Sequence, residues 1–355
     1  MTNSHLARWH TTLFTLRIVT GVGAISRFPH KTPARRSSAW LRSATVVLAV
    51  AVAGGGVLDI ARPDPAAAAP GNGSNLDKYL GTWNYDQPDR KSMRNIAELS
   101  CPAAEPDCES FNPLAPSGSV LQVPQIGRIV FSKEADGKVV GRTDRGCTWR
   151  FTARSDSLQL DPPSQSCFNR VINSGYTITR WSVTVSGRHE KETIAGVSHH
   201  PSGDYDFALE HGARTKVTTE PWAKVARRFT GQWEYVPADR SRLVNIVTYR
   251  STGPDGSAQV SHGEQRGVVE LTVKPDRTVV ARTADGCRWT LTARGNTADL
   301  NPPGQVCRRP GETITLGFWQ VASDGKQQAS IMNGAVQRDG RTSSFVLNVG
   351  ALARR

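Results

Sequence analysis

The chain has 355 residues, of which 38% are hydrophobic and 21% charged, and its formal net charge is +13. This length allows two or three domains of ordinary size, and the composition excludes both a bundle of membrane helices and a disordered chain. A nucleic-acid partner is not expected, because no recognition motif accompanies the positive charge.

The N-terminal residues 1–70 resemble a targeting sequence rather than part of a fold. Three arginines precede an apolar run at 44–58, and a Pro/Ala-rich stretch follows it and ends near Ala69. A basic flank, a short apolar core and small residues before a cleavage point are typical of a secretory signal peptide. The run is shorter than the roughly 20 apolar residues of a membrane-spanning helix. We therefore expect a secreted, periplasmic or cell-envelope protein; an uncleaved signal that stays in the membrane is the alternative.

The expected mature chain is mildly basic. Residues 1–70 contain eight Lys and Arg and two Asp and Glu, so their removal lowers the formal net charge from +13 to +7. Such a charge attracts a protein to anionic polymers and lipid surfaces. An anionic surface of the cell envelope is therefore a candidate partner.

The remainder of the chain contains one sequence pattern twice. The two copies match first at an offset of 150 residues, then at 140 and finally at 138. Each copy is far longer than the unit of a stacked repeat protein, so the pattern indicates a duplicated domain. We expect the first domain at 76–218 and the second at 225–355. Matching positions include Gly81 and Gly231, Trp83 and Trp233, Tyr85 and Tyr235, Trp149 and Trp289, and Trp181 and Trp319.

The six cysteines are expected to form disulfides, as is usual in exported proteins. One pair recurs in both copies, so each recurrence most simply forms a bridge inside its own copy, worth about 3 kcal/mol by the loop-entropy model. The other two cysteines lie where the first copy is ten residues longer, and we expect them to pair with each other. A cysteine metal site is not expected, because the spacing lacks two close pairs. The predicted bridges are Cys101–Cys108, Cys147–Cys167 and Cys287–Cys307.

Both copies consist mainly of short alternating runs. In 147–152, for example, Cys147, Trp149 and Phe151 fall on one face and polar side chains on the other. This period of two predicts antiparallel strands with one face toward water. We count about eight strands in each copy, the number that closes a small barrel. The predicted fold is all-β, with two tandem antiparallel up-and-down β-barrels and one hairpin disulfide in each.

The start of each copy resembles the calycin group, the barrels of the lipocalin and avidin type. Gly-Thr-Trp at 81–83 and Gly-Gln-Trp at 231–233 match the Gly-x-Trp opening of that group. The C-terminal helix of true lipocalins is not visible in the sequence. The resemblance implies a tryptophan that plugs one end of each barrel and a small, often apolar, ligand at the other end.

The resemblance also implies a basic side chain, late in the last strand, across each plugging tryptophan. Arg354 is the candidate for Trp233, and Arg214 or Lys216 is the candidate for Trp83.

The aromatic residues of both copies are the candidate ligand-binding residues. Aromatic walls suit a small-molecule pocket. The competing interpretation is that these side chains fill the barrel cores, since eight strands leave little free space. The candidates are Trp83, Tyr85, Trp149, Trp181, Trp233, Tyr235, Trp289 and Trp319.

No catalytic set is recognisable. The sequence lacks a Gly-x-Ser-x-Gly elbow and a His-Glu-x-x-His motif, and every cysteine has an expected partner. Four histidines, at 189, 199, 200 and 211, are a weak metal-site candidate, because the adjacent His199 and His200 point to opposite faces of a strand. We expect neither a metal nor a cofactor.

These patterns predict a non-enzymatic protein that binds a small hydrophobic or amphipathic molecule. The alternative is a structural or protein-interaction module of the cell envelope with filled barrels. A cavity of roughly 300 Å³ or more would favour the first function.

Overall fold

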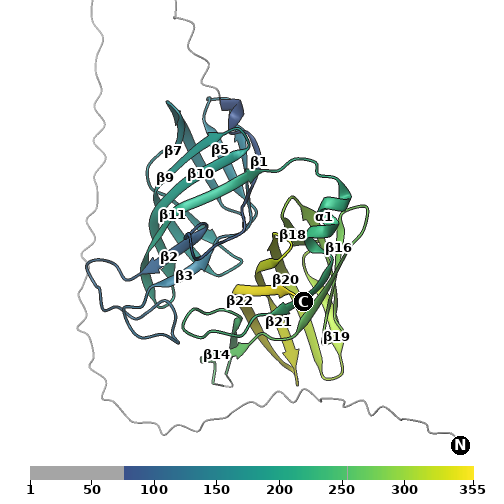
Figure 1. Ribbon diagram of the computed structural model, residues 1–355. Helices are drawn as coiled ribbons and strands as arrows, with labels where there is room; N and C mark the ends of the chain where they lie inside the picture. Colours follow the sequence, from purple (N-terminus) through teal and green to yellow (C-terminus); the bar gives the residue numbers. More distant parts are fainter. Residues whose placement is uncertain (1–75, 254) are drawn as a thin grey trace, which may run out of the picture. The chain divides into compact units, whose positions relative to one another are not determined.

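The computed structural model describes residues 76–253 and 255–355, and the predicted export signal at 1–70 lies outside them. The described chain is almost entirely β-structure, arranged as two closed rings of antiparallel strands that follow each other along the sequence (Figure 1). Each ring has eight strands, taken in chain order. The predicted fold class is therefore confirmed.

The first ring begins after the 3-10 turn η1 (Leu76–Lys78) and closes where its first strand pairs with its last. Two further strands form a hairpin on β11, and a third pairs with β9. The ring strands are β1 (Gly81–Tyr85), β4 (Arg128–Lys133), β5 (Val139–Thr143), β6 (Thr148–Arg154), β7 (Ser157–Leu160), β9 (Ser174–Ser186), β10 (His189–His200) and β11 (Gly203–Lys216). Outside the ring lie β2 (Ile96–Ser100), β3 (Leu121–Pro124) and β8 (Gln165–Asn169).

The second ring repeats this topology strand for strand. Its members are β12 (Gly231–Tyr235), β15 (Val268–Val273), β16 (Thr278–Thr283), β17 (Arg288–Arg294), β18 (Thr297–Leu300), β20 (Glu312–Ser323), β21 (Gln327–Arg338) and β22 (Arg341–Arg354). The additional strands are β13 (Ile246–Thr252), β14 (Ala258–Glu264) and β19 (Gln305–Arg309). Both copies of the sequence pattern therefore form the same barrel.

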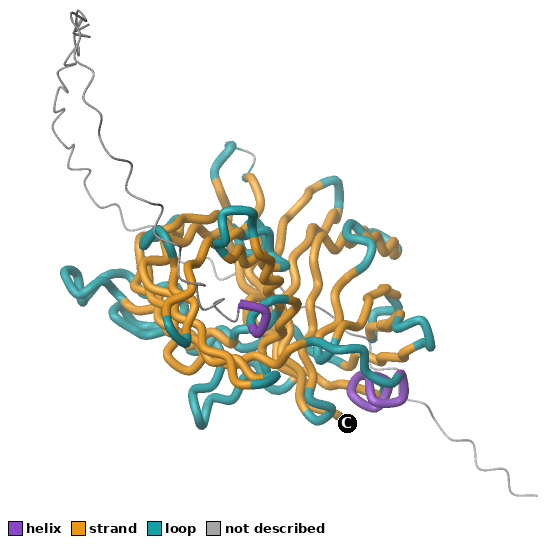
Figure 2. The backbone as a smooth tube through the Cα atoms, turned by 90° about the horizontal axis from the view of Figure 1, so that it is seen from above, coloured by secondary structure: helices purple, strands orange, loops and turns teal. Residues whose placement is uncertain are grey.

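Alternation along the strands builds each barrel core. In β6, Trp149 and Phe151 are buried, whereas Thr148 and Arg150 are exposed. Successive side chains of a strand point to opposite faces, so one face of a ring strand fills the barrel and the other commonly meets water. Parts of β1 and β20 are buried on both faces. Figure 2 shows the strands in orange as closed walls, with the connecting loops in teal.

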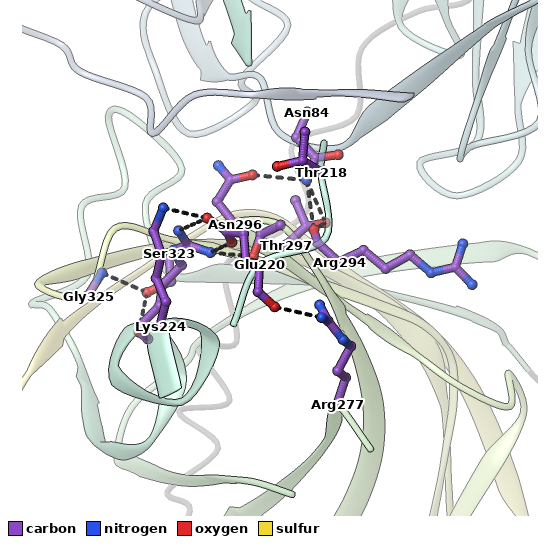
Figure 3. A network of polar contacts seen from close by, with 12 residues as sticks. Asn84, Thr218, Glu220, Lys224, Arg277, Arg294, Asn296, Thr297, Ser323 and Gly325 are labelled. Carbon is purple, nitrogen blue, oxygen red and sulfur yellow. Dashed lines mark hydrogen bonds and ion pairs between the residues drawn. The ribbon is translucent and has the colours of Figure 1, made fainter. Parts of the chain in front are cut away.

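A helix that the sequence analysis did not predict precedes the second barrel. In α1 (Trp222–Phe229), Val225 and Phe229 lie one turn apart and are fully buried in the second core. Glu220 fixes the start of the helix, because its carboxylate pairs with Lys224 at 2.7 Å and its backbone carbonyl accepts a hydrogen bond from Arg277 (Figure 3). A single apolar pair at helical spacing is too weak a signal to predict a helix.

The three disulfides are those predicted from the repeat. Their paired Cα atoms lie 5.6 or 5.7 Å apart. They indicate an oxidising, extracellular environment. Across residues 76–253 and 255–355, no helix combines the length and apolar character that crossing a bilayer requires.

Candidate ligand-binding site

The first barrel contains a cavity of about 100 Å³ that is partly open to solvent. Its wall combines apolar and aromatic side chains with a smaller number of polar groups, as in small-molecule sites. The polar lining includes Asp144 and Arg145 of the β5–β6 loop and Asn169 at the end of β8. The apolar wall includes Trp149, Ile178, Trp181, Ile194 and Phe207.

An arginine also lines this cavity, although it belongs to a buried ion cluster. Nη1 of Arg214 in β11 lies 2.9 Å from a carboxylate oxygen of Glu190 and 2.8 Å from one of Glu192, both in β10. The three side chains, here called the Arg214 cluster, are at most 3% exposed. The guanidinium carbon lies 3.9 Å from the ring centre of Tyr85. Trp181 donates its indole N–H to Glu192 at 2.8 Å.

Burial and mutual repulsion control the protonation of the Arg214 cluster. Burial, reinforced by the neighbouring Glu192, raises the pKa of Glu190 to about 8, even though Arg214 acts in the opposite direction. Burial by itself would lower the pKa of Arg214, but Glu192, Tyr85 and Glu190 raise it above its ordinary value. The guanidinium therefore stays charged, and Glu190 holds its proton at neutral pH.

A glycine provides the space for one of the carboxylates. The pairing of β10 with β11 shifts register between Glu192 and Ile194, and Gly212 lies opposite Glu192. A Cβ atom on Gly212 would lie 2.3 Å from Cγ of Glu192, well inside contact distance. Glycine at this position is therefore a condition for burying the Glu192 side chain.

The second barrel replaces all three members of the cluster with uncharged residues. Glu190 pairs with Arg214 across β10 and β11, and the corresponding pair in β21 and β22 is Gln328 and Leu352. Ser330 takes the place of Glu192 and accepts the indole N–H of its own tryptophan, Trp319, at 3.0 Å. The barrel fold is therefore formed without the ion cluster.

Of the three basic residues considered for Trp83 and Trp233, Lys216 and Arg354 lie over these rings and Arg214 does not. Arg354 lies over the ring of Trp233, with its guanidinium carbon 4.6 Å from the ring centre. The side chain over Trp83 is Lys216, at 5.3 Å, and not Arg214. The register explains the difference, since Trp83 pairs with Lys216 as Trp233 pairs with Arg354.

The eight candidate aromatic residues are all buried, but in two different settings. Tyr85, Trp149 and Trp181 line the cavity of the first barrel. Trp83 lies in the core of the same barrel and donates its indole N–H to the backbone carbonyl of Tyr79. The four residues of the second barrel, Trp233, Tyr235, Trp289 and Trp319, belong to its packed apolar core.

Two of the four histidines that were weighed as metal ligands make hydrogen bonds to other side chains, and His200 contacts Ser202. His199 bridges two strands, with Nε2 2.8 Å from the hydroxyl of Thr177 and Nδ1 2.8 Å from Asp204. His199 and Asp204 are largely exposed, so this chain of hydrogen bonds lies on the outer surface of the barrel. In the part of the chain that the structure describes, no three His, Cys, Asp or Glu side chains are grouped to hold a metal ion.

Comparisons with known proteins add no family assignment. No protein-family profile matches the chain, and no curated protein matches it. The structure shows two closed antiparallel barrels in tandem, and no match assigns them to the calycin group.

Proposed function

We propose that this is an exported, non-enzymatic binding protein whose first barrel takes a small hydrophobic or amphipathic molecule. One observation carries the proposal. The two barrels have the same topology, but only the first places a buried arginine and two buried glutamates beside an aromatic-walled cavity. The equivalent positions of the second barrel hold leucine, glutamine and serine.

The energetics of burial support a role in binding rather than in stability. Removing ionic groups from water costs several kcal/mol per ion, and well-packed uncharged residues often replace a buried ion pair without loss of stability. The second barrel contains such a replacement in Leu352, Gln328 and Ser330. The buried charges of the first barrel are therefore not needed to close the fold. Because they lie beside the cavity, we assign them to ligand binding.

The size of the cavity limits what can be buried in it. At about 100 Å³ it does not reach the roughly 300 Å³ that the sequence analysis named as favouring binding, which is the lower end of the roughly 300–1,000 Å³ of sites that enclose drug-sized ligands. A cavity of about 150 Å³ accommodates benzene. The cavity of the first barrel is smaller than this, so it can enclose only part of a ligand, such as one end of an amphipathic molecule whose remainder extends out of the open side.

The packed second barrel favours a second candidate function. Its four candidate aromatic residues belong to one apolar core, which suits a scaffold whose outer surface contacts other components of the cell envelope. In a combined form of the proposal, the first barrel binds the ligand and the second barrel has the structural role.

Native mass spectrometry of the protein purified from its own host tests the proposal. We expect a small molecule that is retained in the native protein and released on denaturation. The variant Ile178→Phe fills the cavity and should lose this molecule, whereas Leu316→Phe, at the equivalent buried position of the second barrel, should retain it. Thermal unfolding of both variants verifies that they are folded. A clean apo mass, together with no thermal shift against a panel of small aromatic and amphipathic compounds, would favour the scaffold function.

A further inference from the structure

We infer that the cavity of the first barrel selects an uncharged ligand that presents a hydrogen-bond acceptor, such as a carbonyl oxygen, to Arg214. The apolar part of this ligand lies against Trp149, Trp181 and Phe207. The inference rests on the proposed function and specifies the chemistry of its ligand.

The donor capacity of Arg214 is the first argument. A guanidinium group has five N–H donors. Both carboxylate contacts of Arg214 in the structure are made by Nη1. Among the described residues, Nε of Arg214 is buried without a hydrogen-bond partner, and the side chain lines the cavity. A buried donor without a partner costs about 1–3 kcal/mol, which a ligand acceptor would offset.

The charge of the Arg214 cluster is the second argument. Arg214 already pairs with the carboxyl groups of both Glu190 and Glu192, so the guanidinium charge has its counter-ion within the cluster. A ligand carboxylate would bring a buried charge without a counter-ion, and a ligand ammonium would face the guanidinium. Either charge costs several kcal/mol in a buried site, whereas a neutral carbonyl gains a charge-assisted hydrogen bond without adding a charge.

The remaining charged groups of the cavity wall do not change this preference. The other charged groups that line the cavity are Arg128, Asp144 and Arg145. Burial raises the pKa of Asp144, so this carboxylate takes up a proton more readily than an exposed aspartate does. Arg128 and Asp144 already have protein partners, so the Arg214 cluster remains the group that receives the buried end of the ligand.

Four single-ring probes test the inference: benzamide, benzoate, benzylamine and toluene. They share one ring and differ only in its substituent. Ligand-observed NMR titration of the full-length protein at neutral pH therefore measures how that substituent changes the binding affinity. We expect benzamide to bind at least about tenfold more tightly than the other three, the effect of one additional hydrogen bond. Tighter binding of benzoate or benzylamine, or equal binding of toluene, would overturn the inference.

The second barrel provides the matched variant. The triple substitution Arg214→Leu, Glu190→Gln and Glu192→Ser introduces the residues found at the equivalent positions. It should weaken benzamide binding by about tenfold or more and leave toluene binding nearly unchanged. The control Leu352→Met in the second barrel should alter neither.

Retention of the benzamide preference by the triple variant would exclude Arg214 as the recognising group. Failure of all four probes to bind would also overturn the inference. The proposed function is judged separately by the native mass measurement, since a charged natural ligand would refute the inference alone.

Discussion

The substitution Arg214→Leu, made alone, tests whether the Arg214 cluster is a buried ionic unit. Removing one partner of a buried ion pair typically costs roughly 3–5 kcal/mol, because the remaining charge is left uncompensated. Arg214 holds two carboxyl groups, and all three side chains are at most 3% exposed, so we expect a loss in this range. The triple variant with Glu190→Gln and Glu192→Ser should recover most of the loss, because it removes the stranded carboxyl groups as well.

Urea unfolding followed by tryptophan fluorescence measures these differences. The control is Arg180→Leu on β9, where the arginine pairs with Glu210 at 3.4 Å and both side chains are more than half exposed. Exposed pairs contribute about 0–1 kcal/mol, so this control should change the free energy of unfolding only slightly. The reasoning is refuted if Arg214→Leu costs no more than Arg180→Leu, or if the triple variant is as unstable as the single one.

Three further predictions follow from other contacts. The pKa of Glu190 is about 8 in the folded state against an ordinary 4.5, so the folded chain keeps a proton that the unfolded chain releases. Stability should therefore fall as pH rises between these values, by at most about 1.4 kcal/mol per pH unit, and denaturation of Glu190→Gln should show a flatter profile. Arg354 donates hydrogen bonds to the backbone carbonyls of 227, 228 and 230 at the end of α1, so Arg354→Ala should lower the free energy of unfolding by about 1–3 kcal/mol. Arg355→Ala is the adjacent control. Equal losses of stability in the two variants would contradict this role of Arg354. Replacing Cys287 and Cys307 by serine should cost about 3 kcal/mol in the same assay, and an unchanged denaturation midpoint would show that the bridge contributes nothing.

Arg354 also places the C-terminus beside the helix. Its guanidinium reaches carbonyls at the end of α1, and Figure 2 shows the chain end next to that helix. A cation at a helix C-terminus is favourable because the last carbonyls of a helix lack partners within it. The last strand of the second barrel therefore fixes the helix that precedes its first strand.

Much of the architecture could be predicted because strand alternation and duplication are strong sequence signals. The two rings follow from the period of two, and the repeated cysteines resolve a pairing that sequence alone usually leaves open. Helix α1 could not be predicted, since Val225 and Phe229 form its only buried apolar pair.

The Arg214 cluster escaped prediction for a different reason. Alternation places Glu190, Glu192 and Ile194 on one face of β10, but it does not say that Arg214 lies opposite Glu190. Cross-strand register decides which charges meet, and register depends on loops and bulges. A comparison of the copies offered a usable signal, because Arg214 aligns with Leu352 at the offset of 138 that also aligns Lys216 with Arg354.

The spacing of the repeated cysteines has a consequence for how the chain acquires its bridges. Cys147 and Cys167, like Cys287 and Cys307, are separated by 20 residues, whereas a bridge from Cys147 to Cys287 would close a loop of 140 residues. Loop-closure entropy disfavours the long loop by about 1.7 kcal/mol relative to the short one. Since domains fold in order as a chain is synthesised, the first pair can oxidise before the second pair has emerged. A chain that carries the same cysteine pattern twice thereby avoids linking its two copies.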